Sequence, residues 1–176
     1  MPLTHRLATL DDAPALAALM ALAIDRLQAD FLTPDQVVAS RAVMGLDRQL
    51  IADGTYFVIE EDGALAGCGG WSRRATLFGG DHSAGRDAAL LDPLEDAARV
   101  RAMYTHPDHV RRGVGRLILT LCEDAARAEG FTRAELAGTL AGEPLYAANG
   151  YRVIERFEAK PGAVAVPLVR MGKPLV

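Results

Sequence analysis

The chain has 176 residues, a net charge of −4 and 50% hydrophobic residues. This length fits one domain, residues 1–176, better than two. The acidic balance disfavours a nucleic-acid binder or a protein that docks on anionic membranes. No signal-peptide pattern and no apolar run of membrane-spanning length is present. We therefore expect a cytoplasmic protein that binds neither nucleic acid nor membrane.

The two cysteines, Cys68 and Cys122, are too few for a disulfide framework and have no CxxC partner. Buried thiols are the expectation for both. Nothing in their spacing indicates a zinc or redox motif, so we expect no metal.

Periodicity and turn signals predict alternating strands and helices. The helical region after residue 32 begins with a capping box formed by Thr33, Pro34 and Gln36. In chain order, the pattern predicts a strand at 3–8, helical segments at 13–27 and 33–54, a hairpin of strands at 55–59 and 64–71, a strand at 100–105, a helix at 113–128, a strand at 131–137, a short helix at 142–148 and closing strands at 151–157 and 164–171. This order favours an α/β or α+β fold with a mixed sheet covered by helices.

Residues 72–96 show no sustained period and form the longest predicted loop. Loops beyond about 12–15 residues are uncommon in compact domains and often serve as lids or binding loops. A disordered insertion is the alternative.

The segment 104–116 predicts a strand end followed by a glycine-bearing turn that opens a helix. Free N–H groups and the helix dipole favour an anion at such a helix start. Gly113 and Gly115 allow close approach to the main chain, and Arg111, Arg112 and Arg116 add positive charge. The pattern therefore indicates a phosphate site, the alternative being glycines that only start the helix.

Two common phosphate motifs are absent from this turn. A P-loop needs GxxxxGK[ST], and a dinucleotide fingerprint needs GxGxxG near the start of a βαβ unit. The run Gly113-Val114-Gly115-Arg116-Leu117-Ile118 lacks the third glycine.

The segments Tyr104 to Gly115 and Glu143 to Tyr151 resemble the acetyl-CoA signature and the downstream helix of the GCN5-related N-acetyltransferase (GNAT) superfamily. The resemblance extends over essentially the whole chain. It implies the acyl-CoA N-acyltransferase fold, a strongly twisted, mostly antiparallel mixed sheet of six to seven strands with about four helices. Its fourth and fifth strands would splay apart to admit pantetheine.

The same resemblance implies acetyl-CoA as cosubstrate and an amine of a small molecule or a protein as acceptor, acetylated by direct attack in a ternary complex. Tyr146 would be the catalytic general acid toward the CoA sulfur, although it could instead simply pack its ring in the core. A homodimer is possible from the family. The implied cofactor-binding residues are Met103, Tyr104, Thr105, Val110, Arg111, Arg112, Gly113, Val114, Gly115 and Arg116.

Four positions depart from the family pattern. Val110 stands where Gln or Arg is usual, and Thr139 stands where many members have an Asn that contacts pantetheine. Arg99 and Arg101 occupy the strand on which some members carry a catalytic Glu.

An ammonium with a pKa near ~10.4 must lose a proton before it attacks, so something must accept that proton. A water chain to bulk solvent would suffice. The candidate bases among the side chains are Glu95, Asp96, Asp81, His82 and His106.

The acceptor pocket is expected between the first two helices and the 72–96 loop, with Trp71 and Phe78 as candidate lining residues, although core packing is the commoner fate of such side chains. A catalytically inactive acetyl-CoA sensor that binds a partner protein is the main alternative function. An unrelated nucleotide-phosphate binder is a third.

Overall fold

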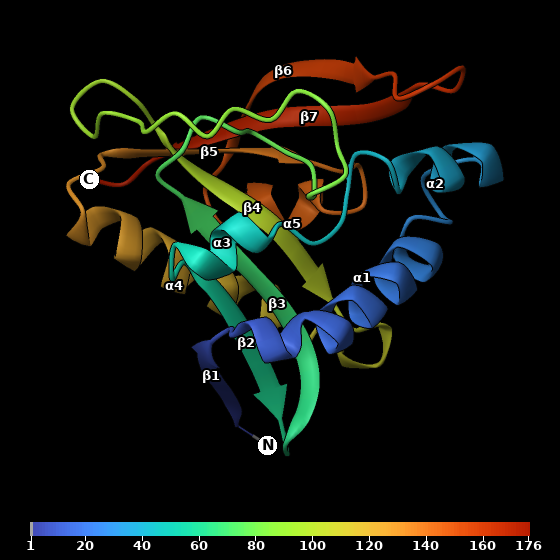
Figure 1. Cartoon of the computed structure of the whole chain (residues 1–176), viewed down its shortest axis with the longest axis horizontal. Helices are drawn as coiled ribbons and strands as arrows, with labels where there is room; N and C mark the ends of the chain where they lie inside the picture. Colours follow the sequence, from blue (N-terminus) through green and yellow to red (C-terminus); the bar gives the residue numbers. More distant parts are fainter. Residues whose placement is uncertain (1) are drawn as a thin grey trace.

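The computed structural model describes residues 2–176 (Figure 1). Two short 3-10 turns, Leu10–Asp12 and Pro107–His109, precede α1 and α4. The elements are β1 (Leu3–Leu7), α1 (Ala13–Leu27), α2 (Pro34–Ser40), α3 (Arg48–Ala52), β2 (Tyr56–Glu61), β3 (Ala64–Ser72), β4 (Ala98–Thr105), α4 (Val114–Ala128), β5 (Arg133–Gly138), α5 (Glu143–Ala148), β6 (Arg152–Ala159) and β7 (Val166–Pro174).

The mixed α/β class predicted from the sequence is confirmed, and the capping box is present in full. Thr33 Oγ1 accepts from the Gln36 N–H, while Gln36 Oε1 accepts from the Thr33 N–H. One prediction was too coarse, because the helical region 33–54 is two helices. Asp47 separates them by accepting from the Gln49 N–H and so capping α3.

The sheet has seven strands in the order β1-β2-β3-β4-β5-β7-β6. All neighbours pair antiparallel except β4 and β5, which are parallel. That parallel ladder is short, with Ala98 opposite Ala134 and Arg99 opposite Glu135. Beyond Arg99 the two strands separate, and in Figure 1 β5 and β7 run across the direction of β2 to β4. The sheet is therefore split along one edge of β4.

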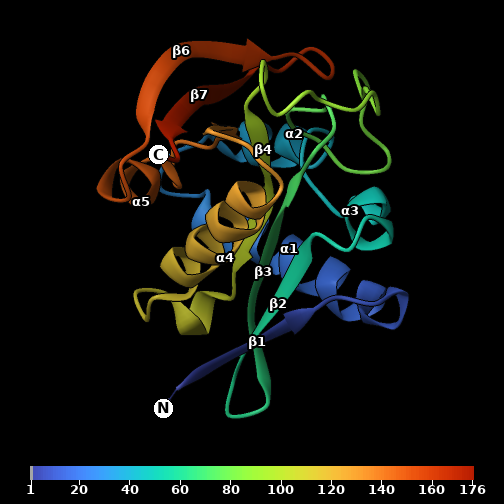
Figure 2. The same ribbon diagram turned by 90° about the vertical axis from the view of Figure 1, so that its left-hand side faces the viewer.

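Helices cover both faces of the β2 to β4 half (Figure 2). α4 lies on one face and buries Ile118, Leu119 and Cys122 against the sheet. α1 and α3 lie on the other face, where Leu16 and Leu50 are fully buried. Burial of apolar side chains in these two layers stabilises the fold, at about 25 cal/mol per Å² of apolar area removed from water.

Three glycines of β3 let neighbouring elements approach the strand closely. A Cβ at Gly67 would meet Val114 Cγ1, and one at Gly69 would lie 2.6 Å from Ile118 Cγ2. A Cβ at Gly70 would lie 2.9 Å from Tyr56 Cα. β3 therefore sets the height at which the first turn of α4 rests on the sheet.

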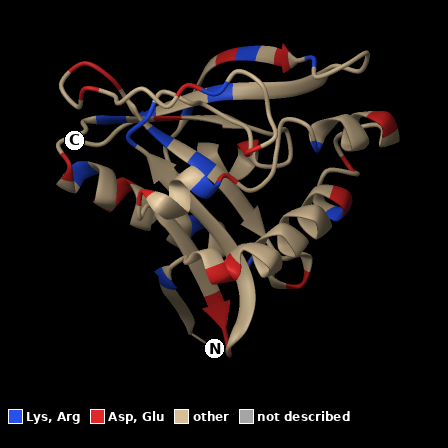
Figure 3. Cartoon of the chain, viewed as in Figure 1, with Lys and Arg blue, Asp and Glu red and all other residues tan. Residues whose placement is uncertain are grey.

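Acidic and basic residues are scattered over the ribbon rather than gathered on one side (Figure 3). Among the helices of residues 2–176, none combines the length and the apolar character needed to cross a bilayer.

Candidate active site

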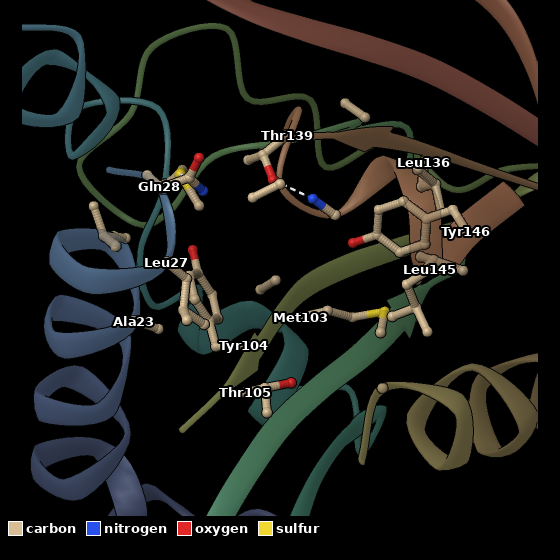
Figure 4. A pocket seen from close by; sticks show the side chains of 18 of the residues that line it. Ala23, Leu27, Gln28, Met103, Tyr104, Thr105, Leu136, Thr139, Leu145 and Tyr146 are labelled. Carbon is tan, nitrogen blue, oxygen red and sulfur yellow. Dashed lines mark hydrogen bonds between the residues drawn. The ribbon is translucent and has the colours of Figure 1, made fainter. Parts of the chain in front are cut away.

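A cavity of about 880 Å³ begins where β4 and β5 separate and continues across β4 to the C-terminal end of α1 (Figure 4). It lies within the usual size range of small-molecule sites, about 300–1,000 Å³. Its walls fall into two halves. One half is formed by β4, β5, α5 and the turn that precedes α4. The other half is formed by α1, residues 43–45 and the 72–96 loop.

The β4 edge that faces the cavity has free main-chain groups. On its other edge β4 pairs with β3 as far as Thr105, whereas toward β5 pairing stops at Arg99. Between Arg101 and Tyr104 the β4 strand contains a bulge, in which Ala102 has a φ of 50°. The Tyr56 hydroxyl donates to the Ala102 carbonyl at 2.6 Å and so holds the bulge. An extended ligand can pair with this edge as an added strand would.

The turn before α4 presents a row of free amides. Within residues 2–176, none of the N–H groups of Arg111 to Arg116 donates to a protein group, and the first helical bond runs from Leu117 N to Gly113 O. Arg111 and Gly113 both have positive φ, 60° and 86°. This alternation curls successive N–H groups into a concave nest, which suits an anion.

Gly115 lies one residue inside the helix, against α5. A Cβ at this position would run into Leu145 Cδ2. Because a side chain here would have to displace the Leu145 side chain, Gly115 allows the helix that carries Tyr146 to pack closely on the start of α4.

Tyr146 projects from α5 into the cavity, with its hydroxyl toward the middle (Figure 4). Its ring packs edge-on against Tyr151, with centroids 6.2 Å apart. Burial raises the pKa of Tyr146 to about 12, so the hydroxyl is protonated at neutral pH and can donate. Just before α5, Thr139 Oγ1 accepts from the Gly142 N–H at 3.1 Å, which fixes the start of that helix.

The other half of the cavity is mainly apolar. Leu27, Val43 and Phe78 line it from three separate segments. Tyr104 connects the halves, because its buried hydroxyl accepts from the Gly45 N–H at 2.9 Å while its main chain belongs to the open β4 edge.

A buried ion network holds this half in place. Arg101 on β4 is 3% exposed and bonds Asp47 at 3.0 Å and the Gly79 carbonyl at 2.7 Å. Arg86 donates to Asp47 as well. Burial works to raise the pKa of Asp47, but the Arg86 hydrogen bond and the Arg101 charge outweigh it, so the pKa lies below its ordinary value.

The family model described as acetyltransferase (GNAT) domain matches residues 52–153, more than half of the chain. The chain belongs to the GNAT acetyltransferase family. A comparison with curated proteins finds no match.

Several solved structures share the GNAT fold of this chain over nearly its whole length. A GCN5-related N-acetyltransferase from Rhodopseudomonas palustris has a TM-score of 0.73 at 19% identity, covering 99% of this chain and 96% of that one. YncA from Salmonella typhimurium, solved with acetyl-CoA, has a TM-score of 0.64 at 20% identity, with coverage of 100% and 95%. PaiA N-acetyltransferase from Thermoplasma acidophilum, solved with coenzyme A, has a TM-score of 0.65 at 12% identity and coverage of 99% for both chains.

The GNAT fold brings nearly all of the sequence-predicted site residues to this one cavity. Arg112 is the exception, because its guanidinium turns away to bond Glu61 at 2.6 Å. Those that line the cavity are Met103, Tyr104, Thr105, Val110, Arg111, Gly113, Val114, Gly115, Arg116 and Tyr146.

Two candidate lining residues were expected in the half of the cavity at α1, and the structure shows where each of them lies. Phe78 lines the cavity together with its neighbours Leu77 and Gly79. Trp71 does not line it and packs in the core, which was the alternative: its ring is 2% exposed and packs edge-on against Phe131 on the α4 side of the sheet. The indole follows the alternation of β3, which turns Trp71 toward the core.

The sequence-predicted bases do not line the cavity, and the side chains of four of them bond other groups. Asp81 pairs with Arg48 at 2.7 Å, and His82 Nε2 lies 2.7 Å from the Arg41 carbonyl. His106 Nδ1 accepts from the Asp108 N–H, Asp96 accepts from the Asp92 N–H, and Glu95 bonds Arg133 through its carbonyl. Asp30, exposed at the rim, is the one carboxylate that the described residues bring to the cavity wall.

Sequence reasoning missed Asp47 and Gln28. Asp47 had a detectable signal, a helix-capping residue two positions after Gly45. Gln28 had none, because a lone glutamine at the end of an amphipathic helix has no distinguishing pattern.

Proposed function

We propose that residues 1–176 form one acetyl-CoA-dependent N-acetyltransferase domain, which transfers acetyl to an amine of a small molecule or a protein by direct attack in a ternary complex. The observation that carries the proposal is the row of free amides from Arg111 to Arg116 beside the open edge of β4. A cofactor with a diphosphate at one end and an amide-bearing arm at the other matches both features.

The residues present fit such a cofactor. The nest would hold the diphosphate through main-chain N–H groups, with Arg111 and Arg116 adding charge at the rim. Met103, Tyr104 and Thr105 would pair with the pantetheine arm through the β4 main chain. Val110, Gly113, Val114 and Gly115 would shape the cradle, and Arg112 would contribute its N–H alone.

Acetyl-CoA supplies an activated thioester whose acetyl carbon an amine can attack. Tyr146 is the residue proposed to act on the departing sulfur. Its raised pKa keeps the proton on the hydroxyl until sulfur develops negative charge, and general acids of this kind contribute about 10²–10⁴ in rate.

The attacking amine must lose one proton as the new C–N bond forms and the C–S bond breaks. Asp30, the cavity carboxylate, is exposed, and the acceptor half opens on this rim. We therefore assign this proton to solvent water rather than to a dedicated side chain. The rate should rise with pH as the free amine becomes neutral.

The test begins with a melting curve in acetyl-CoA. At about 100 times Kd, binding adds about 2.7 kcal/mol, which raises the melting temperature of a chain this size by about 5–11 °C. ATP is the control for a general nucleotide-phosphate binder and should give no comparable shift. No shift at millimolar acetyl-CoA would contradict the proposal.

Turnover over a panel of primary amines separates the enzyme from the sensor. Amine-dependent release of CoA, together with N-acetylated product, is expected. Tight binding of acetyl-CoA without product from any amine would favour a catalytically inactive acetyl-CoA sensor instead.

A further inference from the structure

Glu61, the last residue of β2, bonds two residues of the turn before α4. Its Oε1 accepts from the Arg112 guanidinium at 2.6 Å and lies 2.9 Å from His109 Nδ1. The Arg112 hydrogen bond, with that of His109, holds the pKa of Glu61 below its ordinary value, so the carboxyl is ionised at neutral pH. A carboxylate can only accept, so the imidazole nitrogen carries the proton. Glu61 is 7% exposed and joins β2 to this turn from outside the cavity.

The two partners of Glu61 lie on either side of Arg111, whose φ is 60°. This left-handed conformation is uncommon for a residue with a side chain, because the Cβ crowds the main chain. It persists only where the surroundings fix it. The concave row of amides depends on this conformation at Arg111, and the bonds from His109 and Arg112 to one carboxylate restrain the chain on both sides of it.

Main-chain bonds hold the ends of this segment but not its middle. The His106 N–H donates to a carbonyl of β3 at 2.8 Å, and the first helical bond of α4 ends on the Gly113 carbonyl. Between them, the N–H groups of Arg111 and Arg112 donate to no group in the part of the chain that the structure describes. The side-chain bonds to Glu61 therefore connect the middle of the segment to the sheet.

The two bonds differ in their exposure to solvent. The His109 side chain is 17% exposed, whereas that of Arg112 is 55% exposed. Exposed ion pairs are weak, so the shielded bond from His109 should contribute the larger part of the restraint. Because its guanidinium turns to Glu61 and not to the cavity, Arg112 presents only its main-chain N–H on the cavity side.

We propose that Glu61 is a positioning residue for the cofactor: through His109 and Arg112 it holds the amides of the turn in the conformation that binds the diphosphate of acetyl-CoA. The inference rests on the proposed acetyl-CoA-dependent function. It adds to that site a residue that does not touch the ligand.

Glu61→Leu removes both bonds and tests the proposal. The variant should bind acetyl-CoA at least about tenfold more weakly by titration calorimetry, because the amides lose their orientation. Glu60→Leu is the matched control. Glu60 is the neighbouring residue of β2, but it pairs with Arg6 at 3.0 Å and lies outside the cavity, so this variant should keep the wild-type affinity.

The conservative variant Glu61→Gln should restore most of the affinity. Both bonds end on the same oxygen, Oε1, and a glutamine keeps a neutral acceptor at that place. Its affinity for acetyl-CoA should lie within about threefold of wild type. Melting of the free variants separates the two possible roles. A lower melting temperature in Glu61→Leu with an unchanged Kd would mark Glu61 as merely structural and overturn the inference.

Turnover of an acetylated amine gives a second readout. Glu61→Leu should raise the KM for acetyl-CoA while kcat and the KM for the amine stay near wild type, because the change affects cofactor binding and not Tyr146. A lower kcat with an unchanged KM for acetyl-CoA would contradict the proposal.

Arg112→Leu tests whether the arginine acts through Glu61. It should weaken acetyl-CoA binding less than Glu61→Leu does, and it should add no further loss in the double variant, since both changes remove the same restraint. A further loss in the double variant would show that the guanidinium binds phosphate itself. Tighter binding in Glu61→Leu, from an arginine freed to reach the phosphates, would also overturn the inference.

Failure of this inference is distinguishable from failure of the proposed function. Wild-type protein that binds acetyl-CoA, with an equal affinity in Glu61→Leu, would overturn the role of Glu61 alone. Absence of acetyl-CoA binding to the wild-type protein would instead overturn the proposed function, and this inference with it.

Discussion

The two halves of the cavity differ in the groups that line them, main-chain groups in one half and side chains in the other. The half at β4 and α4 presents main-chain groups, the open strand edge and the amides of Arg111 to Arg116. The half at α1 presents side chains from three segments that are distant in sequence, held by buried charges around Asp47. A binding surface of main-chain groups depends on local conformation, whereas one of side chains depends on the tertiary fold that assembles it.

This difference predicts where each half is vulnerable. Main-chain donors survive most side-chain substitutions but fail when a glycine is replaced. Side-chain walls fail when a charge that anchors them is removed. The variants below separate the two, in order of decreasing effect.

Asp47→Ala should have the largest effect, and it should fall on stability. The change leaves the 3% exposed Arg101 guanidinium without its carboxylate, which costs about 3–5 kcal/mol of unfolding free energy. Urea denaturation measures it. Asp81→Ala is the control, because its pair with Arg48 is solvent-exposed and should be worth about 1 kcal/mol or less. Equal losses in both variants would refute the buried-network account.

Gly113→Glu should weaken acetyl-CoA binding by at least about 100-fold, because a carboxylate would stand where the diphosphate belongs. Titration calorimetry of the folded variant measures it. Gly63→Glu is the matched control: Gly63 also has a positive φ, 77°, and free space for a Cβ, but it lies in the β2–β3 turn. Unchanged affinity in Gly113→Glu would remove the anion site from the proposal.

Tyr146→Phe should lower kcat about 100-fold with little change in acetyl-CoA affinity, because it removes a proton donor but keeps the ring packing. Tyr151→Phe is the control. Its buried hydroxyl bonds Glu123 at 3.1 Å outside the cavity, so this variant should lose about 1 kcal/mol of stability and keep its kcat. Similar losses of kcat would show that Tyr146 acts through packing.

Acid should affect the Asp47 network and leave the amide nest unchanged. A carboxyl whose folded pKa is depressed contributes stability above its unfolded pKa, and this is lost as pH falls through the folded value. Unfolding free energy should therefore be flat from pH 5 to 7 and fall below about pH 4, as Asp47 takes up a proton. The acid limb should be shallower in Asp47→Ala, measured by urea denaturation at each pH. An identical limb in both proteins would exclude Asp47 as a contributor.

The same difference explains what the sequence could predict. The phosphate turn occupies consecutive residues, so Gly113 and Gly115 were identifiable from their letters and from the strand–turn–helix pattern around them. Tyr146 followed from a second short motif resembling the same family. Element positions were predictable because strand and helix periods were clear, as in the helix 113–128, which the structure has as α4, Val114–Ala128.

The half of the cavity at α1 could not be predicted from local sequence patterns. Trp71 was a candidate lining residue, yet the side of β3 on which it falls depends on the sheet register, including the shift opposite Ile59 and Glu60 that leaves Ala66 as an extra residue in β3. The partnership of Asp47 with Arg101 joins residues 54 positions apart, and no local pattern links them. Gln28 lines the cavity only because the fold brings the end of α1 to β4.

The glycines of β3 affect how variants of this protein must be interpreted. Gly69 does not itself line the cavity, yet a Cβ there would lie 2.6 Å from Ile118 Cγ2 and 2.9 Å from Met103 Cγ, so an alanine would press α4 and β4 apart. Such a variant would bind the cofactor more weakly because α4 is displaced, although no ligand touches the substituted position. In a mutational screen scored by activity, β3 would therefore register as a binding hot spot, and only a stability measurement made in parallel would show that its role is that of a spacer.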